Sequence, residues 1–222
     1  MNTKAVAAAR ALFCCILCIW AGCASPRIKP DAIDTKQLVL PSPQKQASNT
    51  IDPSKTSIEI SIRKQKLFLL HDGVVARVYS VSTAVRGAGN AIQSEQTPLG
   101  LHRIYKKIGH SEPIGRIFRW GTPQDRIVSI RQLPLVSYAP RYITTRILWL
   151  EGLETGNNKM GNVDSRRRHI YIHGTNQEGA IGMPDSKGCI LMKNVDIVEL
   201  FDRVREGTLV HIVLDIHSWP DK

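Results

Sequence analysis

The sequence predicts a mainly β fold of the α+β class, in which several strands precede a single helix near the C-terminal end. Residues 57–62 alternate polar and apolar side chains, the pattern of a strand with one buried face. Two further apolar runs, residues 66–70 and 74–82, flank an Asp72-Gly73 turn and predict a β-meander. Apolar residues at helical spacing over 194–205 predict the helix.

The other elements are expected between and after these segments. Further strands are predicted at residues 100–108, 127–130, 146–150, 169–173 and 208–214. The Gly-rich polar segment 84–96 predicts a loop. Residues 109–126 show no clear period and are interpreted as a flap that carries Phe118 and Trp120.

The helix has recognisable ends. Asn194 is expected to cap its first turn, and Gly207 follows its last turn. The face expected to be buried consists of Val195, Val198, Phe201 and Val204.

The N-terminal part has the composition of an export signal followed by a tether. Residues 1–22 join a short basic start to an apolar run, which predicts a signal peptide, and the small residues before Cys23 predict lipidation at that cysteine. Plain secretion or an uncleaved anchor is the alternative. Residues 23–56, rich in proline and polar side chains without periodicity, predict a disordered tether. The folded domain is expected over 57–215, with a C-terminal tail at 216–222.

Cysteine usage fits an exported chain. Of the five cysteines, only Cys189 follows Cys23, so no disulfide can form within the predicted domain. An unpaired thiol in an exported domain requires a functional reason. Ala24, rather than an aspartate, follows the expected lipidation site, which favours the outer membrane. We therefore expect a periplasmic domain anchored to a membrane through an N-terminal lipid.

The net charge of +11 favours anionic surroundings. The sequence contains no helix-turn-helix, zinc-finger or RNA-binding pattern, so a nucleic-acid partner is not expected. The densest basic run, residues 166–168, is interpreted as a solvated loop face.

Two reactive side chains lie at the ends of a Gly-rich connection. His173 and Cys189 are sixteen positions apart, each beside a glycine. A thiol becomes a strong nucleophile when a base accepts its proton, and imidazole does this near neutral pH. A lone cysteine is also often a small buried hydrophobic residue, and a lone histidine is often structural. The residues alone leave both interpretations open.

The residues next to the pair extend the catalytic interpretation. Gly188 lacks a Cβ, so the backbone near Cys189 can approach a carbonyl closely, and amides there can face an oxyanion. The residues assigned to the oxyanion or to substrate are Gly174, Ser186, Lys187 and Gly188, with Ser186 either orienting the loop or a histidine, or acting as a turn residue. No metal site is expected, because His169 and His173 on a strand lie about 13 Å apart, too far to share one ion.

Several separated segments carry a family signature. They are residues 173–175, 181–184 and 186–192, the segments 81–83 and 96–100, and residues 145–150. Taken in their order along the chain, these segments resemble those of the YkuD-type L,D-transpeptidases, enzymes that cross-link the cell wall. The resemblance spans residues 57–214.

The resemblance implies a β-sandwich of mixed sheets with one helix after the catalytic cysteine. It implies that Cys189 attacks a peptidoglycan tetrapeptide stem and that His173 transfers the proton. No cofactor or metal is implied, and the implied partners are the peptide stems. The acceptor amine, a second stem, a protein lysine or a free D-amino acid, is left open.

Two positions depart from the family pattern. Lys187 stands where members often have a second histidine, and Leu191 stands where many have an arginine. These departures keep two alternatives open: a catalytically weak or silent lipoprotein that binds peptidoglycan, and an L,D-carboxypeptidase that uses water as the acceptor.

Overall fold

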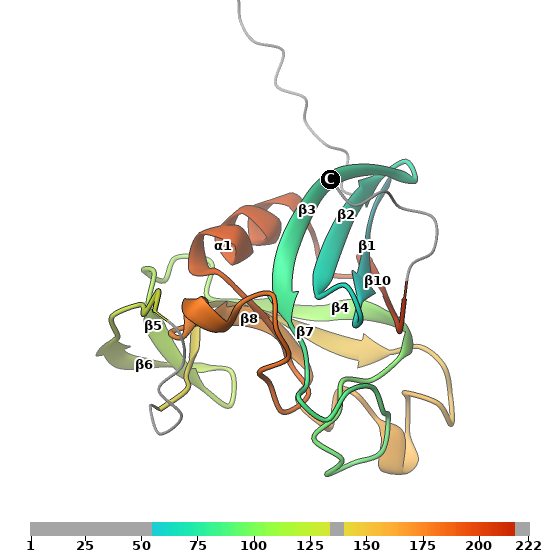
Figure 1. Ribbon diagram of the computed structural model, residues 1–222. Helices are drawn as coiled ribbons and strands as arrows, with labels where there is room; N and C mark the ends of the chain where they lie inside the picture. The colour runs from blue at the N-terminus through green and yellow to red at the C-terminus, as the bar shows by residue number, and fades with distance from the viewer. Residues whose placement is uncertain (1–54, 134–139, 216–222) are drawn as a thin grey trace, which may run out of the picture. The chain divides into compact units, whose positions relative to one another are not determined.

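The computed structural model describes residues 55–133 and 140–215, which fall within one compact unit, Asn49–Lys222 (Figure 1). The expected signal peptide, the lipidation site at Cys23, almost all of the tether and the C-terminal tail lie outside the described residues. Within the described part of the chain, no helix is long and apolar enough to cross a membrane.

The described residues form ten strands, one α-helix and two short 3-10 helices, η2 (Gly161–Val163) and η3 (Glu178–Ala180), in agreement with the mainly β prediction. The strands are β1 (Thr56–Ser61), β2 (Lys66–His71), β3 (Val74–Ser82), β4 (Gly100–Ile108), β5 (Arg116–Arg119), β6 (Thr122–Ile127), β7 (Ile143–Gly152), β8 (Tyr171–Thr175), β9 (Ile190–Met192) and β10 (Leu209–Val213). The helix α1 spans Asn194–Arg203.

All ten strands belong to one sheet, in the order β4-β10-β1-β2-β3-β9-β8-β7-β5-β6. An additional pairing joins β4 to β7, so eight of the strands close on themselves, and the β5–β6 hairpin extends from β7 (Figure 1). The pairing is mixed, since β1–β10 and β8–β9 are parallel and the other pairs are antiparallel. The expected sandwich is therefore one continuous sheet that folds back to close.

The closed sheet surrounds an aliphatic core. Alternate residues of β1, Ile58 and Ile60, are fully buried there, as the polar–apolar alternation predicts. Ile172 of β8 and Ile190 of β9 belong to the same cluster. Strands β8 and β9 are therefore fixed in place by side chains that pack in the core.

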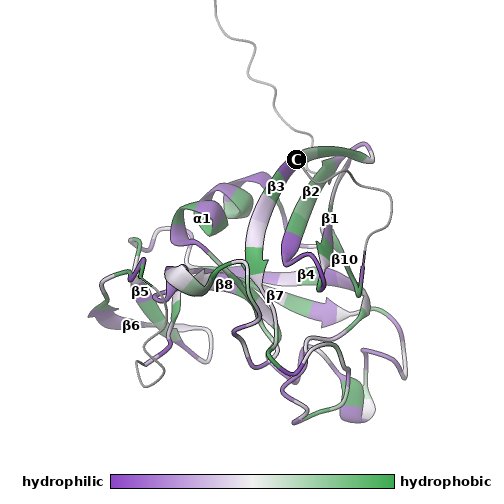
Figure 2. Ribbon diagram, viewed as in Figure 1, coloured by the Kyte–Doolittle hydropathy of each residue, from purple (hydrophilic) through white to green (hydrophobic). Residues whose placement is uncertain are grey.

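Helix α1 packs against β7 and β8, with green apolar and purple polar residues on different faces (Figure 2). Its buried apolar residues are Ile197, Leu200 and Phe201, while Val195 is 62% exposed. The predicted face is therefore wrong at Val195, because the buried face follows the larger side chains at 197 and 200. Full burial of each of these side chains stabilises the fold by about 1.5–3 kcal/mol.

Asn194 does not cap the helix with its side chain, contrary to prediction. Its amide is buried and accepts hydrogen bonds from the hydroxyls of Thr144 and Thr145. It donates to the Thr175 carbonyl at 2.7 Å and to the Glu178 carboxylate at 2.6 Å. Asn194 therefore joins β7, β8 and the start of α1 through buried polar contacts.

Three further segments differ from the sequence prediction. The strand expected at 127–130 is absent, because β6 ends at Ile127. The segment 109–126 contains the hairpin β5–β6, with Trp120 at its turn and 72% exposed. The strand β9 has only three residues, too few for a pattern that predicts a strand.

A bulge in β7 lies opposite the site. The β7–β8 register shifts between Thr144 and Ile147, and Thr145 has a φ of 70°, a left-handed conformation that is rare for a β-branched residue. Beyond the bulge, Ile147 pairs with His173. The bulge in β7 therefore lies directly beside His173 of β8.

Candidate active site

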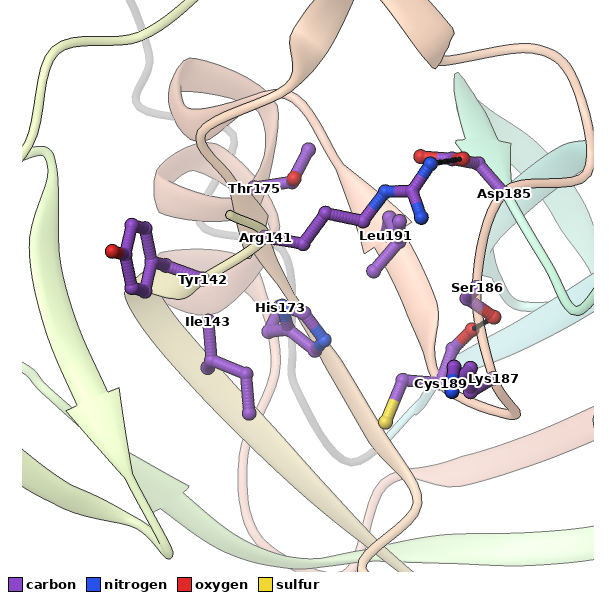
Figure 3. Close-up of a pocket in the computed structure, with 10 residues that line it drawn as sticks. All are labelled: Arg141, Tyr142, Ile143, His173, Thr175, Asp185, Ser186, Lys187, Cys189 and Leu191. Carbon is purple, nitrogen blue, oxygen red and sulfur yellow. Dashed lines mark hydrogen bonds and ion pairs between the residues drawn. The ribbon is translucent and has the colours of Figure 1, made fainter. Parts of the chain in front are cut away.

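The cavity beside β8 and β9 has a volume of about 510 Å³. It is lined by Arg141, Tyr142, Ile143, His173, Thr175, Asp185, Ser186, Lys187, Cys189 and Leu191 (Figure 3). His173 comes from β8, and Cys189 immediately precedes β9. Because these two strands pair in parallel, the histidine and the cysteine reach the same cavity from neighbouring strands.

His173 is 4% exposed, and its Nδ1 lies 2.8 Å from the Gly174 carbonyl oxygen. A carbonyl only accepts hydrogen bonds, so Nδ1 carries the proton and Nε2 keeps its lone pair. Burial lowers the pKa of His173 to about 4, against the opposing effect of the Gly174 carbonyl. The ring is therefore neutral at pH 7 and chemically able to accept a proton at Nε2.

Cys189 is half-buried, and its thiol donates a hydrogen bond to the His169 carbonyl at 3.4 Å. Burial raises the pKa of the Cys189 thiol to about 11, although the Tyr171 amide and the Arg168 guanidinium both lower it. In Figure 3 the sulfur and the His173 ring turn toward the same space. The resting pair is a neutral thiol and a neutral imidazole.

The loop before the cysteine is held by Ser186. Its hydroxyl donates to the Cys189 carbonyl at 2.5 Å and accepts from the Gly188 amide at 3.2 Å. Ser186 thus orients the loop rather than a histidine. The Gly188 amide already has a partner, so an oxyanion role for it requires that this longer bond open.

Residues 55–212 match the YkuD family model, described as the L,D-transpeptidase catalytic domain. The chain belongs to this family. The resemblance that the separated sequence segments indicate is therefore confirmed.

Curated relatives share short, well-matched segments with this chain. The putative L,D-transpeptidase YkuD of Bacillus subtilis is 50% identical over 46 residues, which cover 21% of this chain and 28% of the relative. The probable L,D-transpeptidase ErfK/SrfK of Salmonella typhimurium is 52% identical over 58 residues, 26% of this chain and 19% of the relative. These matches thus span less than a third of each relative's length.

Two L,D-transpeptidases are among the solved structures that this chain is similar to. The enzyme from Xylanimonas cellulosilytica (residues 123–326) matches with a TM-score of 0.39 and 19% identity, over 71% of this chain and 60% of that one. The catalytic domain from E. faecium, acylated by ertapenem, matches with a TM-score of 0.42 and 20% identity, over 72% of this chain and 97% of that one.

Two glycines of the YkuD signature have structural requirements. A Cβ on Gly174 would lie 2.8 Å from the Thr144 carbonyl oxygen, so no larger residue fits between β7 and β8. Gly174 is buried, and its carbonyl orients His173 rather than lining the cavity. Gly188 has a φ of 126°, a conformation that favours glycine, and a Cβ there would lie 3.3 Å from the Gln96 carbonyl oxygen.

Lys187, the first departure from the family pattern, lies at the rim of the cavity. Its side chain is 80% exposed, and its Nζ lies 3.0 Å from Glu95 Oε1. The Lys187 ammonium lowers the pKa of the Glu95 carboxyl. Lys187 therefore pairs the loop before Cys189, called the nucleophile loop (residues 185–189), with the segment 84–96.

The inward position of Arg168 is not indicated by the sequence. The prediction that the run 166–168 is a solvated face is correct for Arg166 and Arg167 but wrong for Arg168. The Arg168 guanidinium donates to the carbonyls of Gly89, Asn90 and Gln96, next to the nucleophile loop. Nothing in a run of three arginines indicates which one turns inward.

His169 lies in a turn before β8 rather than on the strand, and its carbonyl oxygen accepts the hydrogen bond from the Cys189 thiol. Its ring stacks on Trp149 with centroids 5.4 Å apart, and Trp120 meets it edge-on. Among residues 55–133 and 140–215, no group of three or more His, Cys, Asp or Glu side chains is arranged to hold a metal ion.

Proposed function

We propose that this protein is a periplasmic cysteine acyltransferase that acts as an L,D-transpeptidase on peptidoglycan tetrapeptide stems. The observation that carries the proposal is the cavity into which both His173 and Cys189 open, with Nε2 of the histidine free to accept a proton. Membership of the family supports the same reaction class.

The first half-reaction forms a thioester. The Cys189 sulfur attacks the carbonyl between the third stem residue, a diamino acid, and the terminal D-alanine, while His173 Nε2 accepts the thiol proton. The tetrahedral intermediate then collapses, the C–N bond breaks, and the imidazolium returns its proton to the departing D-alanine amine. Because thiol and imidazole are both neutral at rest, proton transfer accompanies attack rather than preceding it.

The second half-reaction transfers the acyl group. An acceptor amine attacks the thioester, His173 takes a proton from that amine, and the thiol leaves with a proton from the histidine. A second stem as acceptor gives a 3→3 cross-link. A protein lysine or a free D-amino acid would react by the same steps.

The experiment is incubation of the purified protein with defined tetrapeptide stems, followed by mass spectrometry. We expect D-alanine release and a covalent stem adduct on Cys189, both of which disappear in Cys189→Ala while the folded circular-dichroism spectrum is retained. Ertapenem, which acylates the E. faecium neighbour, is a second probe for an adduct at the same sulfur. Full D-alanine release by Cys189→Ala would refute the mechanism.

Two observations favour a second candidate, a silent protein that binds peptidoglycan. A thiol with a pKa of about 11 is a poor nucleophile unless the base works well, and Leu191 removes a polar group expected in the cavity. The products separate the candidates: a cross-linked dimer indicates the transpeptidase, a tripeptide indicates the carboxypeptidase, and unchanged stems with wall binding indicate the silent binder.

We also propose that a lipid on Cys23 anchors the protein, with the outer membrane favoured by Ala24. Metabolic labelling with a palmitate analogue should label the protein, and Cys23→Ser should lose the label. If Cys23→Ser is still labelled by the palmitate analogue, the lipid anchor at Cys23 is excluded.

A further inference from the structure

An arginine and a buried aspartate meet on the wall of the cavity that holds the nucleophile. Arg141 Nη2 lies 2.6 Å from Asp185 Oδ1, and Figure 3 shows the guanidinium extending past Leu191 to reach the carboxylate. The Asp185 side chain is only 3% exposed, whereas that of Arg141 is 45% exposed. The carboxylate is thus fixed in the protein while the guanidinium remains open to the cavity.

The pairing leaves hydrogen-bonding capacity unused. A guanidinium has five N–H donors in a planar fork, and within the described residues only Nη2 of Arg141 is paired. Asp185 Oδ2 is buried and has no hydrogen-bond partner there either. Buried polar atoms without partners are uncommon in native proteins and often mark a place where a ligand or a functional group completes the network.

The backbone of Arg141 is held on both sides by one amide. Asn176 Nδ2 donates to the Pro140 carbonyl at 3.0 Å, and Asn176 Oδ1 accepts from the Tyr142 N–H at 2.8 Å. Asn176 directly follows β8, three positions after His173. The same strand end therefore positions both the base and the arginine, so the distance between them is set by the fold.

Arg141 is also the cation that faces inward. Three of the residues that line the cavity carry a formal charge at pH 7: Arg141, Asp185 and Lys187. Lys187 pairs with Glu95 at the rim and is mostly exposed. An anionic group entering the cavity therefore meets the Arg141 donors that no described residue occupies.

We propose that Arg141 binds a carboxylate of the donor stem, positioned by Asp185 and Asn176, and so sets which peptide bond faces Cys189. This inference rests on the proposed transpeptidase function. A bidentate guanidinium–carboxylate contact fixes both distance and orientation. The two residues that flank the scissile bond each offer such a group: the terminal carboxylate of D-alanine, one residue or about 3.8 Å from the scissile carbonyl, and the side-chain carboxylate of the diamino acid.

The first test measures D-alanine release by the full-length protein and its Arg141→Gln and Arg141→Lys variants. Hydrogen bonds to charged groups contribute about 1.5–3 kcal/mol, so kcat/KM should fall about 10- to 150-fold in Arg141→Gln. Arg141→Lys keeps the charge without the fork and should recover part of the loss. Arg167→Gln removes an exposed arginine outside the cavity and should stay within about threefold of the unmutated protein.

The second test uses altered substrates with the unmutated protein, so it does not depend on the variant's folding. One stem ends in D-alanine amide, and another carries an amide in place of the diamino acid's side-chain carboxylate. The stem that lacks the carboxylate bound by Arg141 should react about 10- to 150-fold more slowly with the unmutated protein. With this stem, Arg141→Gln should lower the rate no further, whereas with the other stems it should still lower the rate.

The outcomes separate this inference from the proposed function. Three results would overturn the role of Arg141. The unmutated protein could react equally fast with both amidated stems and the ordinary stem, or Arg141→Gln could lower the rate by the same factor with every stem. The third is a folded Arg141→Gln that is as active as the unmutated protein. Failure of the unmutated protein to react with any stem would instead overturn the proposed transpeptidase activity, and this inference with it.

Discussion

The Cys189 thiol should resist alkylation at neutral pH. Iodoacetamide reacts with the thiolate, and burial raises the pKa of Cys189 to about 11. An ordinary cysteine has a pKa of about 8.5 and is about one-tenth ionised at pH 7.5. With a pKa of about 11, the ionised fraction at that pH is about 1 in 3000, so alkylation should be about 300-fold slower than for an accessible free thiol.

The assay is the rate of carbamidomethylation of the peptide containing Cys189, followed by mass spectrometry from pH 6 to 10.5 with N-acetylcysteine in the same solution. The logarithm of the rate should rise by one per pH unit across the whole range, without a plateau. His173→Ala should show the same rise, because the resting imidazole is neutral and contributes no charge to stabilise a thiolate.

A plateau that begins below pH 9 in the unmutated protein and vanishes in His173→Ala would refute this reasoning. It would show that the two side chains form a thiolate–imidazolium pair at rest. Proton transfer would then precede attack.

Three other perturbations follow from buried groups. The pKa of both His102 and His173 is lowered to about 4 by burial, so the unfolded chain binds more protons between pH 6.5 and 4. The stabilisation from the two neutral histidines is fully present above pH 6.5. As the pH falls to 4, the free energy of unfolding measured by urea denaturation should decrease by up to about 3 kcal/mol per histidine. A free energy of unfolding that does not change with pH over this range would contradict the prediction. Asn194→Ala should lower the free energy of unfolding by about 3 kcal/mol, and a loss under 1 kcal/mol would contradict the buried network. Gly188→Ala should destabilise by about 1–2 kcal/mol and reduce D-alanine release, whereas Gly207→Ala, also at positive φ but in open space, should lose stability and keep activity.

Local patterns predicted the strands of the first half of the domain well, because alternation in β1 reports a face that is buried. The local sequence also indicates His173 and Cys189 as a candidate catalytic pair, since each residue stands beside a glycine at an expected strand end. Neither pattern depends on residues far away in the sequence. That is why the strand predictions agree with the structure, and why a single sequence can indicate the two residues as a candidate pair.

The failures share the opposite property. Asn194 has the residue type of a helix cap, but its side-chain oxygen accepts hydrogen bonds from two threonines about 50 positions earlier instead. Arg141 has no local signal, because its place depends on Asn176 and Asp185, which join it only in the folded chain. Arg168 likewise reaches carbonyls more than 70 positions earlier. Side chains whose partners are distant carry no periodicity that a single sequence can display.

The parallel pairing of β1 with β10 has a consequence for how the chain reaches this state. Ser57 and Leu209 are partners across 152 positions, so the first strand of the domain has its neighbour on that side only when nearly the whole domain has been synthesised. Closing so long a loop costs entropy before the pairing stabilises it, which places sheet closure late and makes folding slow. A nascent or truncated chain that lacks β10 should therefore remain open along that edge and be an easy target for proteases.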